Sequence, residues 1–70
     1  MVSQEKIIRL KVDEIYKFTM RENAGIARFF IGKFLHGNDD EIIIEELNQG
    51  KRWILNIEQI LDIKNINELK

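Results

Sequence analysis

The chain has no cysteine and a single histidine, and these absences remove several classes of site. Without cysteine it has neither a disulfide nor a thiolate metal site to reinforce its fold. One histidine, His36, excludes a multi-histidine metal cluster, and it has no obvious serine partner for catalysis of the triad kind. The sequence therefore predicts no catalytic residue, no metal site and no cofactor.

Long apolar runs are also missing. No run approaches the roughly 20 residues of a membrane-spanning helix, and the N-terminal segment MVSQEKIIRL reaches charged residues too early for a signal peptide. We therefore expect a soluble cytoplasmic protein without a membrane partner. The 70 residues predict one domain, 1–70, with frayed tails at residues 1–5 and 66–70. A core of this size contributes about 3–5 kcal/mol of net stability.

The charges are divided unevenly between the two halves of the chain. Residues 1–37 contain seven Lys or Arg and four Asp or Glu, whereas residues 38–70 contain four and eight. The total of −1 thus combines a basic half with an acidic half. This asymmetry indicates an anionic partner on one side of the molecule only.

Hydrophobic periodicity predicts an α+β fold. Alternation predicts a strand over 6–12, and an i, i+3 stripe predicts a two-turn helix from Asp13. A second helix is expected from about Glu22 to Leu35, and EIIIEELNQGKRWILN (41–56) is typical of a β-hairpin with its turn at 48–51. Asn56 is expected to cap a last helix. The predicted order, β-α-α-β-β-α, is that of a small winged helix-turn-helix domain.

Two glycines lie inside the predicted second helix, where each costs about 1 kcal/mol relative to alanine. The helix would bury Phe30, Ile31 and Phe34. Its opposite face would carry basic residues and gaps: Arg21, Gly25, Arg28, Gly32 and His36. Arginine pairs with phosphate or guanine, and glycine lets a backbone approach closely, so this face fits a DNA groove. Close packing of this face against another helix would also explain the glycines and arginines, and the glycines could equally be tolerated defects of the helix.

Two stretches carry a family resemblance. LKVDEIYKF resembles the opening of small MerR-like winged-helix DNA-binding domains, and GKRWILNIEQIL resembles their wing and closing helix. Small excisionases of mobile elements, carried by phages or transposons, share this size and order. The resemblance covers residues 8–63. It departs from the pattern at Ile15, where alanine is usual, and at TMRE, which replaces a shorter turn.

The resemblance implies a DNA-binding accessory protein that binds and bends double-stranded DNA near the ends of an element and helps an integrase or recombinase. Such proteins are not enzymes, and this one would act as a monomer or as a cooperative oligomer on DNA. The expected DNA-binding residues, from the helix face and from the family positions together, are Arg21, Asn23, Gly25, Arg28, Gly32, Lys33, Lys51 and Arg52.

A protein-interaction module, such as a phage- or plasmid-borne inhibitor, is the alternative. Its acidic surface over residues 39–46 would dock on a basic partner. The apolar centre of that surface would be formed by Ile43, Leu47 and Ile54 on the outer face of the hairpin, whose other face, with Trp53, would pack on the core.

Overall fold

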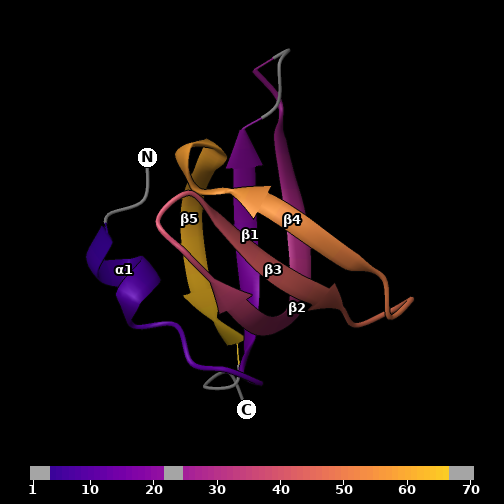
Figure 1. Ribbon diagram of the computed structural model, residues 1–70. Coiled ribbons are helices and arrows are strands. Elements are labelled where there is room, and N and C mark those ends of the chain that lie inside the picture. The colour runs from indigo at the N-terminus through magenta and orange to yellow at the C-terminus, as the bar shows by residue number, and fades with distance from the viewer. Residues whose placement is uncertain (1–3, 22–24, 67–70) are drawn as a thin grey trace.

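Five antiparallel strands form one sheet in the computed structural model, which describes residues 4–21 and 25–66 (Figure 1). The strand order is β4-β3-β2-β1-β5, so β4 and β5 are the two edges. The elements, in chain order, are α1 (Gln4–Ile8), β1 (Ile15–Arg21), β2 (Ala27–Gly37), β3 (Glu41–Glu46), β4 (Arg52–Asn56), the 3-10 turn η1 (Ile57–Gln59) and β5 (Ile60–Asn65).

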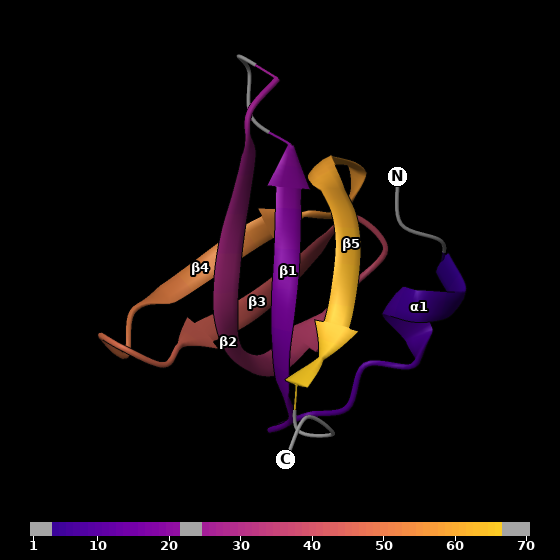
Figure 2. The same cartoon turned by 180° about the vertical axis from the view of Figure 1, so that it is seen from behind.

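The sheet folds over on itself into two layers. β3 and β4 cross one side of the core diagonally, and β1 and β5 lie behind them with the long strand β2 shared between the layers (Figures 1 and 2). Crossed layers of this kind are connected by strands that bend or carry bulges. β2 has such an irregularity against β3 between Phe34 and His36, and β1 has one against β5 between Thr19 and Met20.

Alternate residues of β1, β2 and β3 point into the space between the layers, whereas in β5 the buried Ile60 and Ile63 are three residues apart across the irregularity in its pairing. In β1 the inward-pointing residues are Tyr16, Phe18 and Met20, and in β3 they are Ile42 and Ile44. The complete set of buried apolar residues is Tyr16, Phe18, Met20, Phe30, Phe34, Ile42, Ile44, Leu55, Ile57, Ile60 and Ile63. Full burial of one such side chain contributes about 1.5–3 kcal/mol, so this cluster holds the two layers together.

The N-terminal segment covers one end of this core. Ile7 of α1 and Leu10 after it pack against the cluster. The Tyr16 hydroxyl accepts a hydrogen bond of 2.9 Å from the Lys11 backbone N–H. Asp13 N–H donates to the Phe34 carbonyl at 2.8 Å, and Phe34 N–H donates to the Glu14 carbonyl at 2.9 Å. The segment that precedes β1 is thus attached to β2.

The predicted winged helix-turn-helix fold is wrong. The expected strand at 6–12 is replaced by the end of α1 and a turn, and both central helices are the strands β1 and β2. The predicted last helix is reduced to the 3-10 turn η1, followed by β5. Asn56 does cap η1, since its side chain accepts from the Glu58 N–H.

The hairpin was predicted correctly. β3 and β4 pair from Glu41 opposite Asn56 to Glu45 opposite Arg52. The turn lies between Glu46 and Lys51, whose backbone groups form a hydrogen bond of 2.8 Å. Of the expected tails, Gln4 and Glu5 belong to α1, whereas residues 1–3 and 67–70 lie outside the described residues.

The glycine at position 32 lies where the backbone of β3 closely approaches the inner side of β2, in the paired segment where Gly32 is opposite Glu46. A Cβ there would lie 2.7 Å from the Glu45 carbonyl oxygen and 3.2 Å from Cδ1 of Ile44. Glycine is therefore required at this position because β3 approaches too closely for a side chain. The predicted exposed position of Gly32 on a DNA-facing helix is wrong.

We expect Gly32→Ala to lower the free energy of unfolding by about 1–3 kcal/mol, because the methyl group forces the β3 backbone away. Gly25→Asn is the matched control. Gly25 has φ +76° and open space around it, and asparagine tolerates that conformation, so its effect should be within about 1 kcal/mol. Urea denaturation of the two variants measures the difference. Equal stabilities would contradict the close approach at Gly32.

Candidate nucleic-acid interface

One outer surface of the sheet, formed by β5, β1, β2 and the residue that follows β3, combines basic and apolar side chains. It is the side nearest the viewer in Figure 2. Its residues alternate with the buried ones along each strand, and the pairing register places them in rows across the three strands. The side chains that define this surface, here called the outer patch, are Lys17, Phe29, Ile31, Lys33, Leu47 and Lys64.

Two lysines of the outer patch are direct cross-strand partners. Lys17 of β1 lies opposite Lys64 of β5. Directly opposed side chains have Cβ atoms about 4.5–5.5 Å apart, and like charges at this separation destabilise a sheet. The row therefore concentrates positive charge at the β1–β5 pair, and an anion bound there would neutralise it.

Three large apolar side chains of the outer patch are open to solvent. Phe29, Ile31 and Leu47 are 58%, 42% and 50% exposed. Phe29 and Ile31 are two residues apart on the same face of β2, and Leu47 N–H donates to the Ile31 carbonyl at 3.4 Å. The three therefore form a continuous apolar surface, which is a mark of a binding site on a small domain.

The basic and apolar parts of the outer patch are in contact. Lys17 pairs with Ile31 across the strands, and its ammonium lies 4.4 Å from the centre of the Phe29 ring. The cation–π attraction keeps this ammonium beside an exposed aromatic ring. Because the ammonium lies over one face of the Phe29 ring, a planar ligand would stack on the other face or displace the ammonium.

A row of charges forms the border of the outer patch toward β4. Lys33 of β2 lies opposite Glu45 of β3, and Glu45 lies opposite Arg52 of β4. The Arg52 Nε is 3.8 Å from Glu45 Oε2, so the carboxylate forms an ion pair with Arg52 across β3 and β4. Pairs of this kind on the surface contribute at most about 1 kcal/mol. With one acid between two bases, the border remains net positive.

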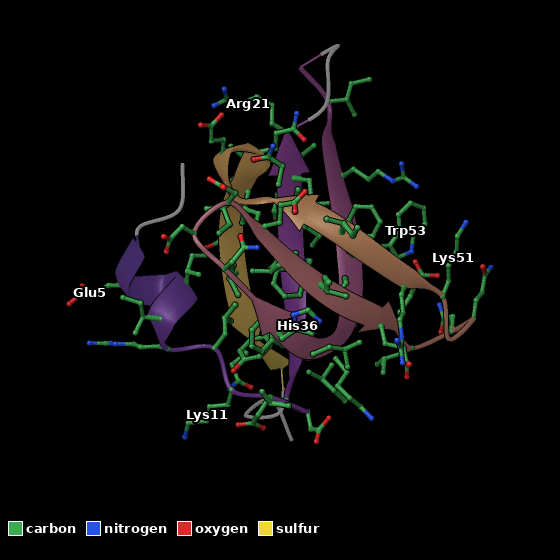
Figure 3. All side chains as sticks on the ribbon, in the orientation of Figure 1. Glu5, Lys11, Arg21, His36, Lys51 and Trp53 are labelled. Atoms are coloured by element: carbon green, nitrogen blue, oxygen red, sulfur yellow. The ribbon has the colours of Figure 1, made fainter. Side chains whose placement is uncertain are left out.

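A second group of aromatic and basic side chains surrounds Trp53 (Figure 3). The Trp53 ring lies 5.2 Å from that of Phe30, and its indole N–H donates to Glu46 Oε2 at 3.1 Å. The Lys51 ammonium is 4.6 Å and the Arg28 guanidinium 5.6 Å from the Trp53 ring. Trp53 is half-buried and packs on the core, as expected. The Lys51 and Arg28 side chains next to its ring therefore lie at the edge of the core.

The structure divides the predicted DNA-binding residues among several places. Arg28 and Lys51 lie around Trp53, whereas Lys33 and Arg52 border the outer patch. Gly32 is interior. Arg21 and Gly25 lie at the far end of the β1–β2 hairpin, and Asn23 is outside the described residues. The predicted set is therefore not one surface. The resemblance to excisionases loses its recognition helix, because that segment is a strand.

Sequence reasoning missed the three residues at the centre of the outer patch. Lys17 was expected on a short helix, Lys64 at the end of another, and Phe29 at the edge of a buried stripe. The IYKFTM stretch alternates apolar and polar residues, which favours a strand with Lys17 and Thr19 on its outer side. Nothing local indicates the partner of Lys17, since β5 is 47 positions further along the chain.

The acidic loop at residues 38–41 is organised by a side chain of its own. Asn38 Oδ1 accepts from the backbone N–H groups of Asp40, at 2.8 Å, and Glu41, at 2.9 Å. The loop is an Asx-type turn between β2 and β3. The alternative of an acidic docking surface over 39–46 stays a prediction. Its expected apolar centre is interrupted, because the Glu45–Arg52 pair lies between Ile43 and Leu47.

Comparison with protein-family models, curated proteins and solved structures finds no match to this chain. None of the helices in the described residues is long and apolar enough to cross a membrane.

The opposed lysines give a stability prediction. Lys64→Glu places a carboxylate opposite Lys17, so we expect the free energy of unfolding to rise by about 0.2–1 kcal/mol at low salt. Lys64→Gln should give a smaller gain, because it removes the repulsion without adding attraction. Thermal unfolding at low and at about 1 M salt provides the measurement, since screening should abolish both gains. A loss of stability in Lys64→Glu would show that the two ammonium groups do not repel each other.

Proposed function

We propose that this protein is a non-catalytic nucleic-acid-binding domain that holds a single strand across the outer patch. The observation that supports this most is the position of Lys17, which lies opposite Lys64 and has its ammonium over the exposed Phe29 ring. Proteins that bind single strands combine a positive track for phosphates with aromatic rings on which bases stack. The outer patch has both components within one sheet face.

The shape of this face favours a single strand over a duplex. A groove of duplex DNA is read by an inserted helix or a projecting β-ribbon. The outer patch instead lies on the broad face of three paired strands, where bases must be unstacked to reach Phe29. Single strands offer such bases without the cost of opening a duplex.

The charges around the patch favour weak, salt-dependent binding. Lys17, Lys33 and Lys64 are available for phosphates, while Asp62 lies opposite Thr19 on the same face and Glu45 lies beside Lys33. Each phosphate neutralised on a single strand contributes a slope of about −0.7 to the logarithm of the binding constant against that of salt. Three lysines therefore correspond to a slope near −2.

This proposal keeps the nucleic-acid partner expected from the sequence and changes the surface that binds it. The action of an excisionase, which includes bending duplex DNA and assisting an integrase, stays a prediction that no comparison tests. An acidic protein is the competing partner for a basic and apolar surface. It differs in having no bases to stack on Phe29.

The role of the lysines is tested with a fluorescently labelled single-stranded oligonucleotide titrated at two salt concentrations. We expect Lys17→Gln to weaken binding and to reduce the salt slope by about 0.7. Lys51→Gln is the matched control, since it removes the same charge beside Trp53 and away from the outer patch, and it should bind like the parent. Equal losses in the two variants, or no binding by the parent at low salt, would refute the proposal.

The role of Phe29 is tested in the same titration. Loss of a base–aromatic stack costs about 1–3 kcal/mol, so Phe29→Ala should weaken binding about 5- to 150-fold. The salt slope should stay unchanged, because no charge is removed. Leu47→Ala removes a comparably exposed apolar side chain that stacks poorly and should have little effect. If both variants bind the oligonucleotide like the parent, the apolar surface serves another partner, and an acidic peptide is the next ligand to titrate.

A further inference from the structure

The free edge of β4 lies away from the outer patch and has backbone groups that can pair with another strand. β4 is the last strand of the sheet and, within the described residues, pairs with β3 alone. Such an edge offers unpaired N–H and C=O groups to another strand. The centre of this edge is Ile54, whose side chain is 63% exposed.

The hydrogen bonds at the two ends of the hairpin show which backbone groups of β4 face outward. Glu46 N–H donates to the Lys51 carbonyl at 2.8 Å, and Ile57 N–H donates to the Asp40 carbonyl at 2.9 Å. Hydrogen-bonded and non-hydrogen-bonded pairs alternate in an antiparallel ladder. Counting inward from either end, Trp53 and Leu55 bond to β3. Arg52, Ile54 and Asn56 therefore direct their backbone groups to the free edge.

We propose that β4 pairs with β4 of a second copy of this chain, antiparallel and centred on Ile54. In this register Ile54 lies opposite its own counterpart, and Arg52 lies opposite Asn56 of the other copy. The Asn56 carbonyl closes the first turn of η1, so this residue contributes its N–H to the pairing. The two-fold arrangement then uses four backbone hydrogen bonds, two between the Ile54 residues and one from each Asn56 N–H to the opposite Arg52 carbonyl, and it joins the two five-stranded sheets into one.

The side chains are compatible with this register. On the outer face Ile43 lies opposite Ile54 within one copy, so pairing places four isoleucines in one row across the two-fold axis. Arg52 comes to lie beside Asn56 of the other copy, whose own neighbour on β3 is Glu41. The row is then Glu45, Arg52, Asn56 and Glu41, with one cation and one amide between two carboxylates. The two Arg52 side chains lie about 13 Å apart, four strand residues from each other.

The edge formed by β5 is protected against pairing with another strand, whereas the edge formed by β4 is not. β5 has an irregular register against β1 and carries Asp62 and Lys64, and bulges and charges are the devices that prevent edge pairing. β4 is regular from Arg52 to Asn56 and has an isoleucine at its centre. Pairing between two β4 strands is therefore favoured over pairing between β4 and β5.

A single introduced cysteine tests the two-fold axis, because the chain has none of its own. Hydrogen-bonded antiparallel partners have Cα atoms about 5.5 Å apart, which a disulfide spans. Under mild oxidation Ile54→Cys should form a covalent dimer at least tenfold faster than Leu47→Cys, a similarly exposed position near the turn of the same hairpin. Equal rates would overturn the proposal.

Sedimentation of the chain without cysteine gives the second measurement. The sedimentation coefficient should rise from the monomer value toward the dimer value as the concentration increases from about 10 µM to 1 mM, a range suited to a short interface. Ile54→Pro should stay monomeric and folded, because proline removes an N–H that β3 does not use. Ile54→Lys, which places two like charges at the axis, should stay monomeric too. A parent that remains monomeric throughout, or oligomers larger than a dimer, would overturn the proposal.

Discussion

The fold depends on the close approach of the β3 backbone to β2 at Gly32. β2 is shared by both layers, and the layers can enclose one core only if β2 changes direction along its length. At this approach the Glu45 carbonyl oxygen lies 2.7 Å from the position that a Cβ at residue 32 would take. The buried rings of Phe30 and Phe34 lie two residues away on either side and fill the space under the bend. Both outer surfaces follow from this bend, because it turns the outer faces of β1–β2 and β3–β4 in different directions.

The same strand explains why the sequence misled as to the class of fold. Phe30 and Phe34 are spaced four apart, a separation that places residues on one face both of a helix and of a strand. The residues between Phe30 and Phe34 distinguish the helical period of 3.6 from the strand period of 2. Ile31 is 42% exposed and Gly32 faces the core, as a strand requires and a helix does not. The helical cost of the two glycines and the many β-branched and aromatic residues of 15–37 were the available signals for strands.

The hairpin was predictable because its information is local. A turn around Gly50 and alternating apolar residues on both sides fix the pairing of β3 with β4 within 16 positions. The candidate interface was not predictable in the same way. Lys17, Phe29 and Lys64 come together only when β1 pairs with both β2 and β5, and no local pattern encodes the last of these pairings. Lys33 and Arg52, which were predicted to contact DNA from a helix and a wing, lie at the border of the outer patch on the strands β2 and β4.

Two surface features connect the fold with the two proposals. Lys17 lies opposite Lys64 on one face of the sheet, and the regular β4 edge carries the exposed Ile54. Opposed like charges cost at most about 1 kcal/mol, whereas the net contribution of a core of this size rarely exceeds about 3–5 kcal/mol. A single substitution would remove either one without touching the core. In the two proposals, a bound partner offsets each feature. A phosphate would neutralise charge at the lysine row, and a second strand would pair the free backbone groups of the β4 edge.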